Sequence, residues 1–212
     1  LLNKKFTVKN IMDEKLSGED IRKYVASLRL SISNYFFIKN PLFSEEKRKE
    51  YRKSIVYLEK LNRLEFSSFL PLILSLMNKK ISDDELVEIL KSIERFIFVI
   101  FRISRFFSTF KNSKFYSLAN KFKNQEISIS EINQEINQIK QENENINAFK
   151  EWILPKFNNA DGYYSWNALR YILFEYELFL KNNKGRNEDK IDWKAFVESK
   201  KDYISIEHIF PQ

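Results

Sequence analysis

Residues 82–101 have the sequence SDDELVEILKSIERFIFVIF, and this stretch decides the fold class. Its first four residues have the form of a capping box, in which the Ser82 hydroxyl accepts from the Glu85 amide and the Glu85 carboxylate accepts in return. Apolar residues then recur three and four positions apart, as on one face of an α-helix. From residue 96 to 101 every residue is apolar, and a helix that is apolar all round lies inside a bundle. We therefore expect a central helix here.

Helical signals of the same kind cover most of the 212-residue chain, which contains only three Gly and four Pro. Three further helices are expected in the first half of the chain: from about Glu19 to Asn40, from 45 to 64 after a cap at Ser44, and from about Ser68 to Lys80 with Pro71 in the first turn. Two more are expected in the second half. One begins at a second capping box at residues 128–131, and the other runs from a cap at Asp161 to about 182–186. A brief helical piece around 193–197 and a β-branched run at 203–206 follow. The predicted fold class is all-α, an irregular multi-helix bundle over residues 1–200 with a short strand-like C-terminal tail.

Three of these helices carry apolar stripes of the kind that packs against a core. The stripes consist of Ile21, Val25, Leu28 and Ile32 in the first, Ile132, Ile136, Ile139, Ile146 and Phe149 in the second, and Trp166, Leu169, Ile172, Leu173 and Leu178 in the third. The second stripe fits a core or a dimer interface equally.

Composition excludes several classes of site. The chain has no Cys, one His and three widely separated Gly, so it contains no disulfide framework, P-loop or dinucleotide fingerprint. Glu175 and Glu177 lie two positions apart on a helix and point in different directions, which argues against paired-carboxylate hydrolysis. No apolar run approaches the ~20 residues that span a bilayer. We predict a soluble cytoplasmic protein without a membrane partner.

Charge is unevenly distributed along the chain. The net charge is +7, yet residues 101–125 carry six basic residues and no acidic one. These are Arg102, Arg105, Lys111, Lys114, Lys121 and Lys123, and six aromatic residues are interleaved with them. Such a mixture is typical of surfaces that neutralise phosphates and stack bases, which predicts DNA as a partner, especially if residues 47–53 lie nearby. The alternative is that the aromatic residues are core and the cations a solvated face.

The single histidine follows the strand-like run. Glu207 and His208 are adjacent, and an acid beside a His at a strand end can supply a metal ligand and a general base that activates water. The alternative is an exposed, inert histidine.

The segment IEHIFPQ at residues 206–212 closely resembles the opening of the HNH-like (His-Me finger) nuclease domain of GmrSD-type modification-dependent restriction endonucleases. Several upstream segments are similar to the helical region that joins the two halves of those enzymes. They are residues 67–76 (SSFLPLILSL), 81–85, Leu90, 93–96, Arg102 and 169–177 (LRYILFEYE). The Glu-His element behind the last helix carries most of the resemblance, because the remainder is helical patterning.

The resemblance implies a bacterial DNA restriction enzyme that acts in defence against phage. Its N-terminal domain is associated with NTP hydrolysis, and its C-terminal domain cuts modified DNA with a divalent metal. His208 would be the general base and Glu207 a metal-site residue, with residues 201–212 as the truncated start of the nuclease domain. The implied partners are DNA and the missing N-terminal and nuclease domains of the same chain.

The chain differs from these nucleases in the metal-binding residues that it contains. In a His-Me finger, a second strand and a following helix bring further Asn or His groups to the metal, whereas here four residues follow His208 and the chain has one His and no Cys. The sequence also begins at Leu1, where an initiator Met would stand. We therefore expect a non-catalytic fragment with no cofactor of its own. The resemblance implies a divalent metal and NTP only for the full-length enzyme. The alternative function is a helical protein-interaction or structural module with no nucleic-acid role.

Overall fold

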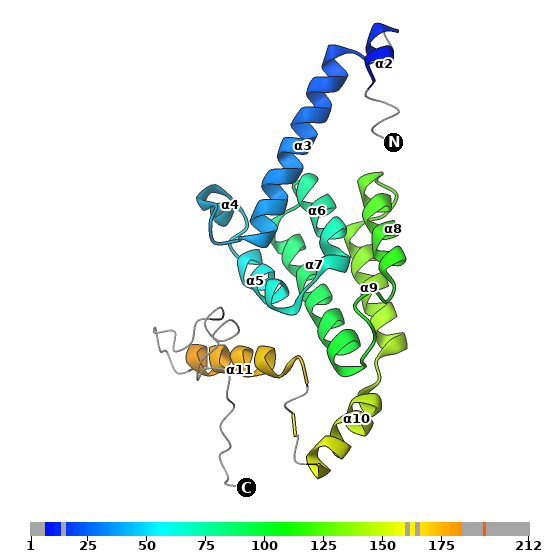
Figure 1. The fold of residues 1–212 in the computed structure, drawn as a ribbon. Helices are drawn as coiled ribbons and strands as arrows, with labels where there is room; N and C mark the ends of the chain where they lie inside the picture. Colours follow the sequence, from blue (N-terminus) through cyan, green and yellow to red (C-terminus); the bar gives the residue numbers. More distant parts are fainter. Residues whose placement is uncertain (1–6, 14–15, 160–161, 164–165, 184–192, 194–212) are drawn as a thin grey trace. The chain divides into compact units, whose positions relative to one another are not determined.

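The computed structural model describes residues 7–13, 16–159, 162–163, 166–183 and 193 (Figure 1). Helices account for all of its regular secondary structure in these ranges, so the all-α prediction is confirmed. Two compact units are present within the range that we expected to form one bundle. The first contains residues 1–101 and 106–144, and the second contains residues 102–105 and 145–212. No helix among the described residues combines the length and apolar character that crossing a bilayer requires.

The first unit is organised around α7 (Asp83–Phe96). Ser82 and Glu85 form the predicted capping box, with the Ser82 amide donating to the Glu85 carboxylate at 2.9 Å. α7 packs between α5 (Ser54–Leu64) and α9 (Ile129–Asn143), and it also touches α6 (Leu70–Asn78) (Figure 1). The expectation of a central helix is therefore confirmed.

An aromatic cluster fills the core where α7 meets α8 (Asn112–Lys123) and the short 3-10 helix η1 (Ser67–Phe69). The Phe69 ring lies 5.5 Å from Phe96 and 4.1 Å from Phe115, measured between centroids. Phe96 and Phe115 meet edge to face at 5.1 Å. All three side chains are fully buried, so three segments distant in sequence are joined through one aromatic contact.

Beyond α7 the chain continues as a π-helix, η2 (Ile97–Ile103), which the sequence pattern did not predict. The wider turn of a π-helix changes which residues share a face. Ile97, Ile100 and Phe101 are buried, but Phe98 and Val99 are half-buried. Residues 96–101 are therefore less completely buried than we expected for a helix that is apolar on every face.

The predicted helix over residues 45–64 is interrupted. α4 (Glu45–Glu50) and α5 are separate, and Ser44 makes no side-chain cap hydrogen bond. The carboxylate of Asp83, at the start of α7, accepts from the backbone amides of Lys53 at 2.8 Å and Ser54 at 3.0 Å. The break follows because this carboxylate supplies partners for the first amides of α5.

The first long helix, α3 (Gly18–Lys39), begins one residue before the predicted start, behind a Ser17–Asp20 capping box. It ends before Asn40 and Pro41, as predicted. The prediction that its apolar stripe faces the core is wrong, because Val25, Leu28 and Ile32 are exposed. The buried residues of α3 are Asn34, Phe37 and Ile38, which lie near its C-terminal end.

The helix after Ser128 is shorter than its apolar stripe predicts. α9 has the predicted capping box and buries Ile132, Ile136 and Ile139 inside the first unit, to which it belongs. It ends at Asn143, and Asn145 then caps α10 (Ile146–Asn158) by accepting from the Ala148 amide at 3.0 Å. The single stripe that was expected from Ile132 to Phe149 is therefore wrong, because its last two members belong to α10.

The second unit contains α10 and α11 (Leu169–Asn183). Trp166 precedes α11 rather than belonging to it, and Leu173 is exposed, which corrects two expectations for this helix. Tyr171 is the one residue that α11 buries. The expected cap at Asp161 and the strand-like run at 203–206 lie outside the described residues.

Candidate nucleic-acid interface

The two units divide the six cations predicted to bind DNA. Arg102 and Arg105 belong to the second unit, whereas the four lysines lie on α8 or at its start in the first unit. Each group therefore forms a surface of its own.

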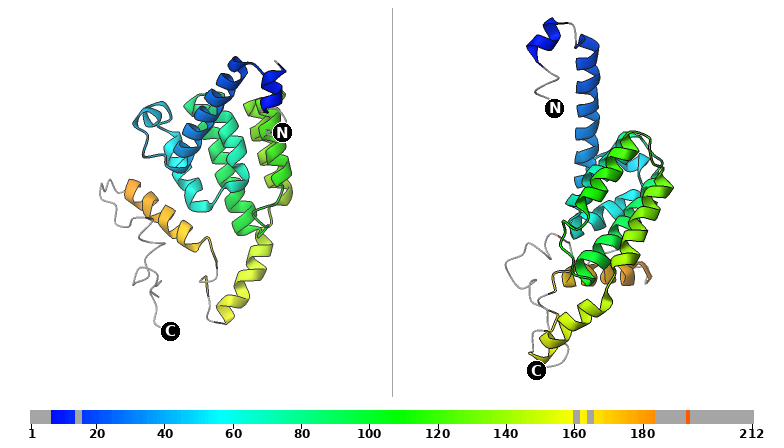
Figure 2. Two further views of the ribbon diagram at one scale, coloured as in Figure 1. Left: turned by 45° about the horizontal axis from the view of Figure 1, so that its top comes forward. Right: turned by 90° about the vertical axis from the view of Figure 1, so that its right-hand side faces the viewer.

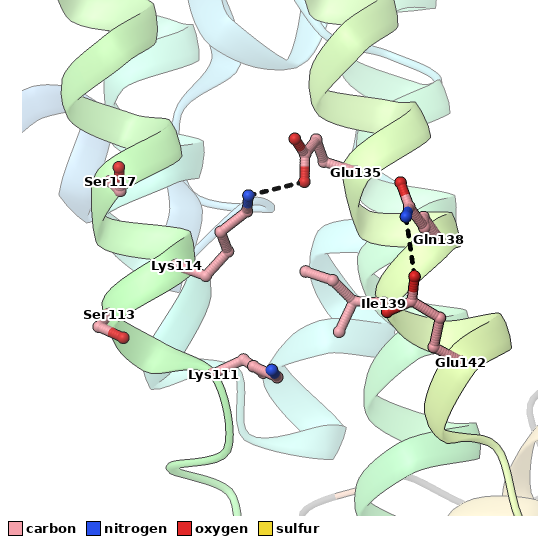
Figure 3. Close-up of a pocket in the computed structure, with 8 residues that line it drawn as sticks. All are labelled: Lys111, Ser113, Lys114, Ser117, Glu135, Gln138, Ile139 and Glu142. Atoms are coloured by element: carbon pink, nitrogen blue, oxygen red, sulfur yellow. Dashed lines mark hydrogen bonds and ion pairs between the residues drawn. The ribbon is translucent and has the colours of Figure 1, made fainter.

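Lys111 and Lys114 line a groove between α8 and α9 with a volume of about 500 Å³ (Figure 3). The groove is lined by Lys111, Ser113, Lys114, Ser117, Glu135, Gln138, Ile139 and Glu142. The Lys114 ammonium pairs with the Glu135 carboxylate at 2.9 Å, and the Gln138 amide donates to Glu142 at 2.8 Å. Because two lysines face two glutamates, the groove has little net attraction for a phosphate.

Lys111 occupies the N-cap position of α8 in the left-handed region, with φ of 58°. Its ammonium lies 5.5 Å from the Phe110 ring centroid. Both lysines of the last turn, Lys121 and Lys123, are exposed, and the structure records no ion pair for them among the described residues. Lysines at a helix C-terminus also stabilise the helix through its dipole, so their position has a structural explanation as well.

The cations of α8 do not form one stripe. Lys114 and Lys121 are seven residues apart and share one flank of the helix, at 3.6 residues per turn. Lys123 is seven residues after Tyr116 and lies on the other flank. A straight DNA backbone could therefore contact one flank at a time.

The aromatic residues of the segment separate into core and surface. Phe115 is fully buried, and Phe106 packs on Phe110 with centroids 4.4 Å apart. Phe107 is 85% exposed and Tyr116 is 47% exposed. The core alternative is therefore correct for Phe115, while Phe107 and Tyr116 remain available for stacking.

In the second unit, Arg105 is placed against α10. Its guanidinium carbon lies 4.2 Å from the Trp152 ring centroid, and the Lys156 ammonium lies 5.2 Å from the same ring. Arg105 is exposed and has a φ of 63°. Two cations thus share one indole, an arrangement that favours anion binding beside an aromatic surface.

Two hydrogen bonds hold the Arg102–Arg105 segment in this position. The Trp166 indole donates to the Arg102 carbonyl at 3.1 Å, and the Asn145 amide donates to the Ser104 hydroxyl at 2.7 Å. Sequence analysis missed Trp152 and Lys156. Their spacing of four on a helix was the available signal, but nothing in the sequence linked them to Arg105.

The second basic segment, residues 47–53, makes local contacts. Lys47 donates to the Asn34 side chain at 2.6 Å, Lys49 pairs with Glu45 at 3.1 Å, and Lys53 pairs with Asp84 at 2.7 Å. The contact with Asp84 raises the pKa of the exposed Lys53 ammonium. These lysines therefore contribute less to an open positive surface than their number suggests.

The predicted nuclease residues Glu207 and His208 lie outside the described residues. Within the described ranges, no three His, Asp or Glu side chains are grouped so that they could hold a metal ion. The whole chain contains one His and no Cys.

Comparison with family models, with curated proteins and with solved structures finds no match to the chain.

Proposed function

We propose that the chain is the helical part of a GmrSD-like, modification-dependent DNA restriction endonuclease. In this proposal it links an N-terminal NTPase-like domain to a C-terminal metal-dependent nuclease and is not catalytic by itself. The observation that carries the proposal is the Ile206–Gln212 segment, IEHIFPQ, which follows a long helix. The helical structure of the described residues supports it, because the linking region of such enzymes is helical.

The chemistry assigned to this segment is proton transfer. His208 would accept a proton from the attacking water, for which an imidazole is suited near neutral pH. A divalent metal, when bound, would stabilise the charge that develops on the phosphate. Glu207 would belong to the metal site. The remaining groups of the site would be Asn or His side chains, and the chain holds no second histidine.

DNA contact is the part of the proposal that the described residues can support. Lys121 and Lys123 are exposed and without recorded ion pairs, and Arg105 with Lys156 forms a second positive site on Trp152. Lys114 contributes least, because Glu135 already neutralises it. We propose that phosphates are bound mainly by Arg105, Lys111, Lys121 and Lys123, with Arg102 nearby in the sequence.

Salt dependence of DNA binding tests this proposal. For binding to a short duplex, log K should fall with log salt by roughly 0.9 for each phosphate neutralised, giving a slope of about −3 to −4. The double variant Lys121→Glu with Lys123→Glu should flatten the slope by about 1, because the two lysines lie on opposite flanks of α8 and only one of them contacts the DNA backbone at a time. Fluorescence anisotropy across a salt series measures the slope for the unchanged protein and for the double variant.

The matched control is Lys79→Glu, which reverses the charge of an exposed lysine that follows the last residue of α6 and lies outside the proposed surface. It should leave the slope unchanged. Undetectable or salt-independent binding, or an equal effect of Lys79→Glu, would contradict the proposal.

A protein-interaction module is the second candidate function. The exposed apolar face of α3 favours it, because contiguous apolar surface on a folded protein marks sites of association. Absence of DNA binding together with association through α3 would support this candidate instead.

A further inference from the structure

The outer face of α3 carries a row of exposed apolar side chains. Val25 is 57% exposed, Leu28 42%, Ile32 66% and Tyr35 46%. The N-terminal half of the helix extends past α5, α6 and α7 (Figure 2). The exposed fractions show that these four side chains are accessible to solvent.

Polar contacts fix the rotation of α3 and so determine which face points outward. The Asn34 side chain donates to the Asn78 side chain of α6 at 2.9 Å, and Asn78 donates in turn to the Ser31 hydroxyl at 3.0 Å. At 100° per residue, Val25 and Ile32 lie about 160–180° from the buried Asn34. The apolar row is therefore on the face opposite the bundle.

The spacing of the row is that of a coiled-coil seam. With Ile21 and Tyr35 at its ends, the apolar positions 21, 25, 28, 32 and 35 alternate by four and three, which is the a and d pattern of a heptad. Val25 and Ile32 occupy a positions, and Leu28 occupies a d position. β-branched residues at a with leucine at d favour parallel two-stranded pairing.

We infer that a second copy of this chain covers the α3 seam in a parallel, in-register, two-helix coiled coil. The inference does not rest on the proposed nuclease role. The seam is self-complementary because each copy presents the same a and d residues to the other.

The flanking charges select the parallel orientation. Arg22 and Arg29 occupy e positions, while the g positions hold Tyr24 and Ser31. In a parallel pair, e residues face g residues of the partner copy, so Arg29 faces Tyr24. In an antiparallel pair, e faces e, which sets arginine against arginine and is repulsive.

The seam is short, about four helical turns, so we expect it to bury less than the ~800 Å² per partner of a standard stable interface. Association should therefore be reversible, with a dissociation constant of roughly 10 μM. Sedimentation equilibrium of the whole chain over a concentration series should show a monomer–dimer equilibrium in that range. Ile32→Glu should weaken the dimer by about 100-fold or more, because it places a charge inside the seam.

Ser33→Glu is the matched control, since Ser33 is exposed and lies off the seam. It should leave the dimer intact. Circular dichroism of both variants checks that the helices remain folded.

The orientation is tested by cross-linking, which the absence of cysteine in the chain makes specific. In a parallel in-register pair the two residues at an a position lie within bridging distance, so Ile32→Cys should form a disulfide-linked dimer on mild oxidation. Ser33→Cys should not. A chain that stays monomeric, a dimer that survives Ile32→Glu, or equal cross-linking of Ser33→Cys would overturn the inference.

Discussion

At the scale of single residues, Asp83 links two helices. Its backbone begins α7, and its carboxylate accepts from the Lys53 amide, the Ser54 amide and the Ser54 hydroxyl at the start of α5. Ser54 is fully buried, so the Asp83 carboxylate is the hydrogen-bond partner of groups that water cannot reach.

Asp83→Ala should therefore destabilise the first unit by about 2 kcal/mol, the combined effect of a lost cap and an unsatisfied buried serine. Urea unfolding followed by circular dichroism measures this change. Asp84→Ala is the matched control, because Asp84 is also in the first turn of α7 but pairs only with the exposed Lys53. Its cost should be about 0.5 kcal/mol or less. Equal effects of the two substitutions would show that Asp83 has no capping role.

The capping box of α9 gives a prediction on pH. The Ser128 hydroxyl and backbone amide donate to the Glu131 carboxylate and lower its pKa below the ordinary value of 4.5. A folded-state pKa below the unfolded value contributes stability that is present above the unfolded pKa and is lost as pH falls through the folded pKa.

Ser128→Ala should raise the pKa of Glu131 toward 4.5, because it removes the hydroxyl donor. Titration of the Glu131 carboxyl resonance by NMR measures the pKa in each protein. Ser130→Ala, two positions away and outside the capping box, should leave it unchanged. An unaltered Glu131 titration in Ser128→Ala would contradict the capping-box geometry.

Capping boxes were predictable from sequence because their partners lie three residues apart. Those of Ser82 and Ser128 are present as predicted. The cap that Asp83 supplies to α5 was not predictable, because its partners lie 29 and 30 residues away and meet only after the helices pack.

At the scale of elements, the contact of η1, α7 and α8 depends on Phe69, Phe96 and Phe115. Phe115→Ala should cost about 3–5 kcal/mol, since it removes a fully buried ring from a packed aromatic cluster. Phe107→Ala, in the same segment, should change stability by less than about 0.5 kcal/mol, because that ring is 85% exposed. Thermal or urea unfolding of each variant measures its loss of stability. Comparable losses would mean that Phe107 is packed rather than exposed.

The pattern of apolar residues predicted which segments are helical better than it predicted what each helix packs against. The stripes of α3 and α9 have similar periodicity, but α9 packs its isoleucines on α7 while α3 turns its stripe outward. Periodicity identifies an apolar face, and tertiary contacts such as the Asn34–Asn78 pair decide whether that face is buried.

At the scale of the whole molecule, the basic segment was predicted as one surface and is divided between two units. A run of charge along the sequence does not determine a surface, because the chain leaves the first unit at Arg102 and returns at Phe106. The pairing of Arg105 with Trp152, 47 positions apart, is a consequence of this path and could not be read from local sequence.

We propose that this chain contributes the helical part and the general base of a modification-dependent DNA nuclease. The most direct test of this proposal is cleavage of plasmids with and without modified bases in Mg²⁺ or Mn²⁺, by the isolated chain and by the complete protein that the proposal implies. The isolated chain should cut neither plasmid. The complete protein should cut only modified DNA and lose that activity in His208→Ala. Cutting by the isolated chain that depends on His208, or cutting by the complete protein that His208→Ala leaves unchanged, would contradict the account.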